Sequence, residues 1–105
     1  MDEKKTSALF QPEPIECDII DGDGKIRHLV AQVRVTKKNL KEYASWFDEA
    51  DKMRLTEPER VQSFLCTKIF GGKEEDYENF EIRVLKAAIN FFNQKNMVPT
   101  LTAGA

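Results

Sequence analysis

The sequence has few of the residues that build thiol, redox and metal sites. It contains two cysteines, Cys17 and Cys66, and a single histidine, His28. The cysteines lie far apart in the chain, so neither a CxxC redox pair nor a zinc ligand cluster can be drawn through them. Both have apolar neighbours, which predicts buried or half-buried free thiols, with a structural disulfide as the alternative.

Motifs for catalysis and for cofactors are also lacking. In neither registration does the DGDG segment (residues 21–24) supply the first-position and twelfth-position acids of a calcium loop together, so it predicts a hairpin turn instead. Gly71-Gly72 lacks the lysine, serine and spaced glycines of a phosphate-binding loop. His28 has no cysteine or carboxylate at ligand spacing and predicts a surface residue of a strand. We therefore expect no catalytic, cofactor-binding or metal-binding residues, and a protein that is not an enzyme.

Long hydrophobic runs are absent as well. No apolar stretch approaches the roughly 20 residues that a membrane helix needs, and the charged beginning MDEKK is not followed by the apolar stretch of a signal peptide. We therefore expect no membrane partner and a cytoplasmic location. A length of 105 residues, with 41% hydrophobic and 32% charged side chains, predicts one globular domain with a large solvated surface.

The charge is distributed unevenly. A formal net charge of −2 disfavours a general nucleic-acid-binding protein. Residues 25–41 nevertheless carry six lysines and arginines and no acid, whereas acids dominate residues 42–51 and 74–81. The basic segment has two interpretations: a solvated face that complements the acidic helices within the fold or between copies, or a patch for an acidic partner or nucleic acid.

The residues that are present predict an α+β fold, dominated by helix, in which a β-hairpin precedes about three α-helices. Apolar and polar residues alternate from Ile15, which predicts a strand, and a second strand is expected over residues 25–35. A hairpin is marginal alone, so helices must cover its apolar face. We expect a flexible arm over residues 1–14, one domain over 15–98 and a flexible tail over 99–105.

The first two helices have recognisable boundaries. Thr36 is the expected N-cap of a helix that ends near Arg54. Thr56 and Glu59 fit a capping box at the start of the next helix. Gly71-Gly72 is expected to end that second helix, because glycine adopts the left-handed conformation most easily.

The third helix is expected from the acidic segment 74–76 to about Asn96, with Pro99 setting its limit. It has more apolar circumference than one packed face needs, which favours a surface for another protein. We predict a partner-binding or self-binding face formed by one of its stripes and two aromatic residues of the first helix, although Trp46 has the alternative of covering the core. The residues of this face are Tyr43, Trp46, Ile82, Leu85, Ile89 and Phe92.

The order of motifs resembles the tail assembly chaperones of long-tailed bacteriophages. A hairpin on DGDGK is followed by the helix TKKNLKEYASWFDEADKM, by a second helix ending in KIFGGKEEDYENF and by a last apolar helix. The likeness spans residues 15–98, and IFGG followed by acids is its most specific element.

The resemblance implies a small non-catalytic chaperone in the host cytoplasm. Such a protein coats the tape measure protein until tail tube protein replaces it. It is expected to form homo-oligomers, and families of this kind include longer forms made by ribosomal frameshifting. Two other functions remain open: a small nucleic-acid-binding regulatory protein that uses residues 25–41, and a structural virion component such as a head–tail connector.

Overall fold

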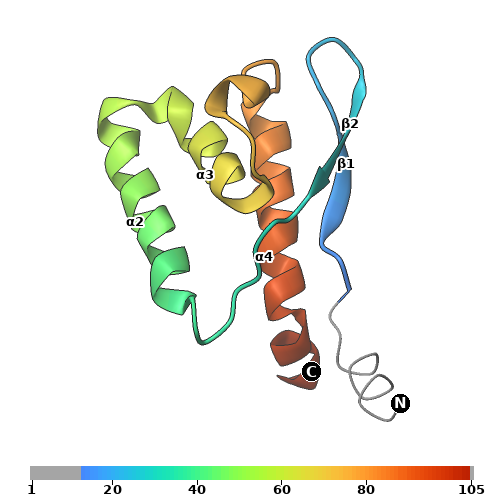
Figure 1. Ribbon diagram of the computed structural model, residues 1–105, viewed down its shortest axis with the longest axis vertical. Coiled ribbons are helices and arrows are strands. Elements are labelled where there is room, and N and C mark those ends of the chain that lie inside the picture. The colour runs from blue at the N-terminus through green and yellow to red at the C-terminus, as the bar shows by residue number, and fades with distance from the viewer. Residues whose placement is uncertain (1–12, 105) are drawn as a thin grey trace.

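The protein has an α+β fold in which a two-stranded antiparallel hairpin precedes three α-helices, as the sequence predicts (Figure 1). The computed structural model describes residues 13–104, so most of the predicted arm, residues 1–12, lies outside it. The elements, with η for a 3-10 helix, are β1 (Glu16–Ile20), β2 (Ile26–Val30), α2 (Leu40–Thr56), η1 (Pro58–Arg60), α3 (Val61–Phe70), η2 (Glu74–Tyr77) and α4 (Ile82–Gly104).

The side chain of Asp21 organises the hairpin turn. Its Oδ1 accepts hydrogen bonds of 2.9 Å from the backbone N–H groups of both Asp23 and Lys25. This carboxylate satisfies two donors that the turn would otherwise leave unpaired, which is the usual role of aspartate in such loops. The predicted turn is therefore confirmed, and Cys17 pairs with Leu29 in the ladder that follows.

Strand β2 is shorter than the expected 25–35, because the chain after Ala31, whose N–H still donates to the carbonyl of Ile15, bonds to helices. The N–H of Gln32 donates to the carbonyl of Ile69 at 2.7 Å. The N–H of Val35 donates to Oδ1 of Asn96 at 3.1 Å. These two bonds fasten the segment between β2 and α2 to the end of α3 and to α4.

The first helix begins later than expected. Thr36 is not its N-cap; α2 starts at Leu40 after Asn39. The amide of Asn39 explains the delay, because it holds a separate turn before the helix. Its Oδ1 accepts from the N–H of Thr36 at 2.7 Å, and its Nδ2 donates to the carbonyl of Arg34 at 2.6 Å.

The boundary between α2 and α3 also differs from the prediction. Thr56 is the last residue of α2, and the short helix that follows has no side-chain cap, so the capping box with Glu59 is wrong. The predicted end of the second helix is confirmed, since α3 stops at Gly71 and both Gly71 and Gly72 have positive φ, 86° and 83°. Glycine is the residue that tolerates this backbone region.

The acidic segment forms the short helix η2, and α4 begins only at Ile82. One cause is the docking of the hairpin tip: the carbonyl of Asn79 accepts a 2.6 Å hydrogen bond from the N–H of Gly22, so it does not take part in a helix. At its other end α4 continues to Gly104, and the predicted limit at Pro99 is wrong. A proline inside a helix removes one backbone hydrogen bond without forbidding the helix.

Helix α4 is the centre of the fold. Helix α3 covers one side of it and the hairpin covers another, while α2 packs on the far side of α3 (Figure 1). The buried side chains come from all of these elements, so the hairpin's apolar face is covered as expected. They are Ile15, Ile19, Ala50, Val61, Leu65, Cys66, Ile69, Phe70, Tyr77, Phe80, Leu85, Ala88, Ile89 and Phe92.

Candidate functional site

The stripe of α4 that was expected to bind a partner lies mostly inside the protein. Leu85, Ile89 and Phe92 are only 2%, 4% and 0% exposed, respectively. They pack in the core of their own chain, so the expectation of an exposed face is wrong for these three residues. The physical reason is that two different elements, α3 and the hairpin, flank α4 and together cover more of its circumference than one neighbour could. Ile82 remains 52% exposed at the start of the helix.

The two aromatic residues of α2 are half-buried. The hydroxyl of Tyr43 donates to Oδ1 of Asn93 on α4, and its ring lies 4.8 Å from Phe47 and 6.1 Å from Phe92, between centroids. Burial raises the pKa of Tyr43 above its usual value, so the phenol stays a neutral donor. Trp46 meets Tyr43 edge to face at 6.2 Å and packs against the core. Tyr43 therefore joins α2 to α4.

A groove at the start of α4 is the largest concave site that includes an expected residue. We call it the acidic groove. It has a volume of about 510 Å³ and lies where η1, α3, η2 and α4 meet. Its lining consists of Glu59, Arg60, Ser63, Glu74, Tyr77, Glu78, Phe80, Ile82 and Leu85.

The acidic groove has an apolar floor and a charged rim. Phe80, Ile82 and Leu85 give the floor, and Ile82 is the one of these three with a largely exposed side chain. Glu59 and Glu78 on the rim are exposed and make no ion pair with any described residue. Free carboxylates around an apolar surface suit an apolar segment with basic residues.

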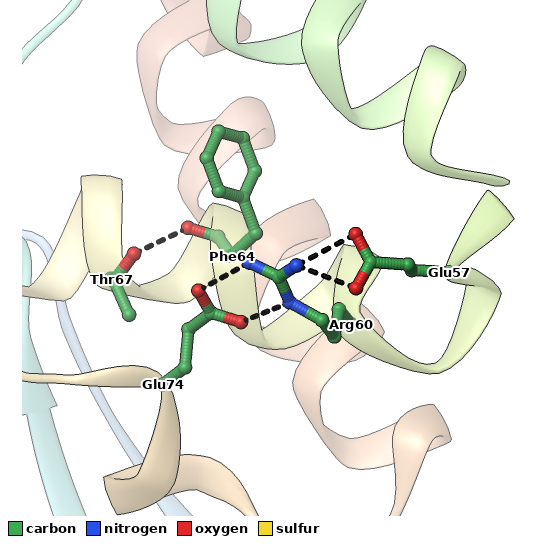
Figure 2. A network of polar contacts seen from close by, with 5 residues as sticks. All are labelled: Glu57, Arg60, Phe64, Thr67 and Glu74. Atoms are coloured by element: carbon green, nitrogen blue, oxygen red, sulfur yellow. Dashed lines mark hydrogen bonds and ion pairs between the residues drawn. The ribbon is translucent and has the colours of Figure 1, made fainter.

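Arg60 fixes one wall of the acidic groove (Figure 2). Its Nε and Nη2 bond to the two carboxylate oxygens of Glu74 at 2.8 and 2.9 Å, while its Nη1 lies 2.7 Å from both oxygens of Glu57. Such planar, charge-assisted bonds are geometrically specific. The hydrogen bonds to Glu74 and then to Glu57 raise the pKa of Arg60, and the hydrogen bond from Arg60 lowers the pKa of Glu74. We call Arg60 with Glu57 and Glu74 the clamp. It holds η2 against the start of α3.

A second charged surface lies at the opposite end of α2. We call it the basic face: Arg34, Lys37, Lys38 and Lys41, with Leu40 among them. Leu40 is 52% exposed, and the three lysines are exposed too. No described carboxylate lies within ion-pair distance of these four cations. Of the basic segment, Arg27 pairs with Asp21 at 3.7 Å, whereas these four cations form no ion pair with a described residue.

The outer face of the hairpin carries a small polar cluster. Nδ1 of His28 lies 2.7 Å from Oδ1 of Asp18, directly across the ladder, and its Nε2 lies 3.3 Å from Oε2 of Glu16. These two hydrogen bonds raise the pKa of His28, and the bond with Asp18 has the larger effect. Spacing along the chain did not reveal these carboxylates, because they lie on the other strand. His28 is a surface residue of a strand, as predicted.

The thiols and acids of the described residues offer little reactive chemistry. Cys17 is half-buried, Cys66 is buried and both are free, as the sequence predicts. Burial raises the pKa of Cys66 to about 12, with a smaller contribution from the neighbouring Cys17. Little thiolate therefore forms. Within residues 13–104 no group of three or more His, Cys, Asp and Glu side chains could hold a metal ion. No helix of this range has the length and hydropathy needed to span a membrane.

The six predicted residues therefore do not form one surface. Tyr43 and Trp46 belong to the contacts of α2, three residues of α4 belong to the core, and only Ile82 lines the acidic groove with an exposed side chain. Sequence reasoning missed Glu59 and Glu78 as residues of a binding site, although the density of acids after Gly72 was a signal for Glu78. Comparisons of the chain with protein-family models, with curated proteins and with solved structures found no match.

Proposed function

We propose that this protein is a non-catalytic chaperone of phage tail assembly, which works in the host cytoplasm by coating the tape measure protein before tail tube protein replaces it. The observation that supports this function best is the acidic groove, an open apolar surface with two carboxylates that have no partner among the described residues. The α+β architecture is compatible with the resemblance between the sequence and this class of protein.

The chemistry of the acidic groove defines the client segment. Its floor takes apolar side chains at helical spacing, and Glu59 and Glu78 attract lysine or arginine beside them. A single contact of this size is weak. Many copies along one extended client act together, because each bound copy raises the effective concentration of the next site.

Co-expression with a phage tape measure protein tests the proposal. We expect wild-type protein to keep the tape measure protein in the soluble fraction and to co-purify with it. Ile82→Asp places a charge on the apolar floor of the acidic groove and should abolish co-purification. Ile26→Asp is the matched control, since Ile26 is 71% exposed on the hairpin and outside the groove.

Equal capture by both variants would contradict the assignment of the groove, and failure of wild-type protein to bind would contradict the function. Mass spectrometry of mature particles separates a chaperone from a head–tail connector, because a chaperone is absent from finished virions.

The basic face favours a second candidate, a small nucleic-acid-binding regulatory protein. Four cations without carboxylate partners in residues 13–104 can contact phosphates. This function predicts binding to heparin and to DNA or RNA that weakens steeply with salt. Lys37→Gln combined with Lys38→Gln should then reduce the slope of affinity against salt concentration, whereas no retention on heparin would rule the candidate out.

A further inference from the structure

We infer that copies of this chain associate head to tail, with the basic face of one copy seated in the acidic groove of the next. The inference uses the same acidic groove as the proposed function but concerns the protein without its client, so a neighbouring copy and the client compete for this groove. Both surfaces are present on the same chain, so every copy can bind one neighbour through its basic face and another through its acidic groove.

Charge complementarity selects the occupant of the groove. The basic face carries three exposed cations, Lys37, Lys38 and Lys41, and the acidic groove carries two exposed anions, Glu59 and Glu78. Neither set forms an ion pair with another described residue. Opposed patches of this kind steer two surfaces together and fix their register.

The apolar parts of the two surfaces match as well. Leu40 projects from the basic face with 52% of its surface exposed, and Ile82 on the floor of the acidic groove is also 52% exposed. The groove volume of about 510 Å³ has room for a leucine side chain and the stems of flanking lysines. Leu40 against Ile82 and Phe80 would give the contact an apolar centre with ion pairs at its rim, the usual anatomy of a protein interface.

The geometry prevents the two surfaces from meeting within one chain. Leu40 is the first residue of α2, whereas Glu59 follows the last residue of that helix (Figure 1). At 1.5 Å per residue, the 17 residues of α2 separate the two surfaces by about 25 Å. A contact between different patches at opposite ends is heterologous, so it extends into a chain of copies or closes into a ring.

The experiment compares the mass of purified protein in solution with that of two variants. The face variant carries Lys37→Gln, Lys38→Gln and Lys41→Gln, and the groove variant carries Glu59→Gln and Glu78→Gln. All five side chains are exposed and make no ion pair with a described residue, so both variants should keep the wild-type circular dichroism and melting temperature.

Multi-angle light scattering and sedimentation velocity at low ionic strength should show wild-type mass rising with concentration beyond a dimer. Each variant alone should weaken this self-association about tenfold to hundredfold. A mixture of the two should form complexes that stop at two chains, because the intact groove of the face variant binds the intact face of the groove variant and no further contact remains. In about 1 M salt, where charges are screened beyond about 3 Å, the wild-type assembly should dissociate.

A charge swap provides the decisive control. Lys37→Glu, Lys38→Glu and Lys41→Glu combined in one chain with Glu59→Lys and Glu78→Lys should restore self-association, because the complementarity is reversed but kept. Wild-type protein that stays monomeric up to about 1 mM, at the weak end of measurable affinities, would overturn the inference. Equal assembly by wild type and both variants would overturn it too, even if binding to the tape measure protein is confirmed.

Discussion

The hydroxyl of Tyr43 on α2 donates a hydrogen bond to Oδ1 of Asn93 on α4. The two residues are 50 positions apart, and the bond links the helix that carries the basic face to the central helix of the fold. The bond therefore holds the beginning of α2, where the basic face lies, against α4.

Tyr43→Phe should lower the free energy of unfolding by about 0.5–1.5 kcal/mol, because it removes one partly buried hydrogen bond and keeps the ring. Urea denaturation monitored by circular dichroism measures the change. Ser45→Ala is the matched control, since it removes an exposed hydroxyl that donates within α2 and should leave stability almost unchanged. Equal effects of the two substitutions would show that the Tyr43 hydroxyl does not join the helices.

Phe92→Ala should destabilise the protein by about 3–5 kcal/mol, the usual cost of emptying a core aromatic site. Phe92 is 0% exposed and contacts the rings of Tyr43 and Phe70. Ile82→Ala on the same helix should cost less than about 0.5 kcal/mol, because its side chain is half in solvent. Thermal and urea unfolding of both variants measure this difference in stability. A small effect of Phe92→Ala would contradict the place of that residue in the core.

Arg60→Gln and Arg60→Lys should both loosen the segment that the clamp holds, since neither side chain can bond to Glu57 and Glu74 as the guanidinium does. Hydrogen–deuterium exchange should become faster at residues 71–81. Arg54→Gln removes an exposed pair with Asp51 and serves as control.

The clamp also predicts a response to acid. The pKa of Glu74 is lowered from its usual value of 4.5, mainly by its hydrogen bond with Arg60. Its contribution to stability is therefore complete above pH 4.5 and is lost as the pH falls through the lowered value. Glu74→Gln should remove this part of the acid dependence, and an unchanged acid profile would contradict the clamp.

His28 should titrate above its usual pKa of 6.5, because its hydrogen bonds to Asp18 and then Glu16 favour the charged ring. Its contribution to stability is thus complete below pH 6.5 and disappears as the pH rises through the raised value. It is the single histidine of the chain, so NMR of untagged protein reports this pKa directly. Asp18→Asn should lower the pKa more than Glu16→Gln, and a wild-type midpoint at or below 6.5 would disprove the cluster.

The two thiols should react with a disulfide reagent in separate phases. Burial raises the pKa of Cys66 to about 12 and leaves its side chain 0% exposed, so it should react only as the protein unfolds. Cys17 also has a raised pKa, from burial and then from the charge of Asp18, but it is half-buried and should react first. Cys17→Ser should remove the fast phase alone; loss of the slow phase instead would reverse the assignment.

Local chemistry explains which parts of the fold could be predicted. The turn at residues 21–24 and the end of α3 at Gly71 each depend on conformations that neighbouring residues determine by themselves, and both are confirmed. The early starts expected for two helices are wrong because other groups compete for their ends, a local side chain at α2 and the distant hairpin tip at α4. Asn39 bonds to Arg34 before α2, and Asn79 bonds to Gly22 before α4.

The predicted surface failed for a related reason. The spacing of Leu85, Ile89 and Phe92 shows that this side of α4 is apolar, but it contains no information on how many elements cover it. The acidic groove was beyond prediction in the same way. It needs Glu59 and Glu78 to come together across the turn after α3, and the bond between Arg60 and Glu74 that positions them joins residues 14 apart.

The core also determines when the protein can fold during its synthesis. Ile15 and Ile19 from the hairpin share this core with Phe92. The ribosome makes the hairpin first, and its partner surface on α4 emerges only after some seventy further residues, a separation that follows from the positions of Ile19 and Phe92. Until then the newly made strands have unpaired edges and an exposed apolar face. Simultaneous synthesis of many copies therefore favours mispairing between nascent chains.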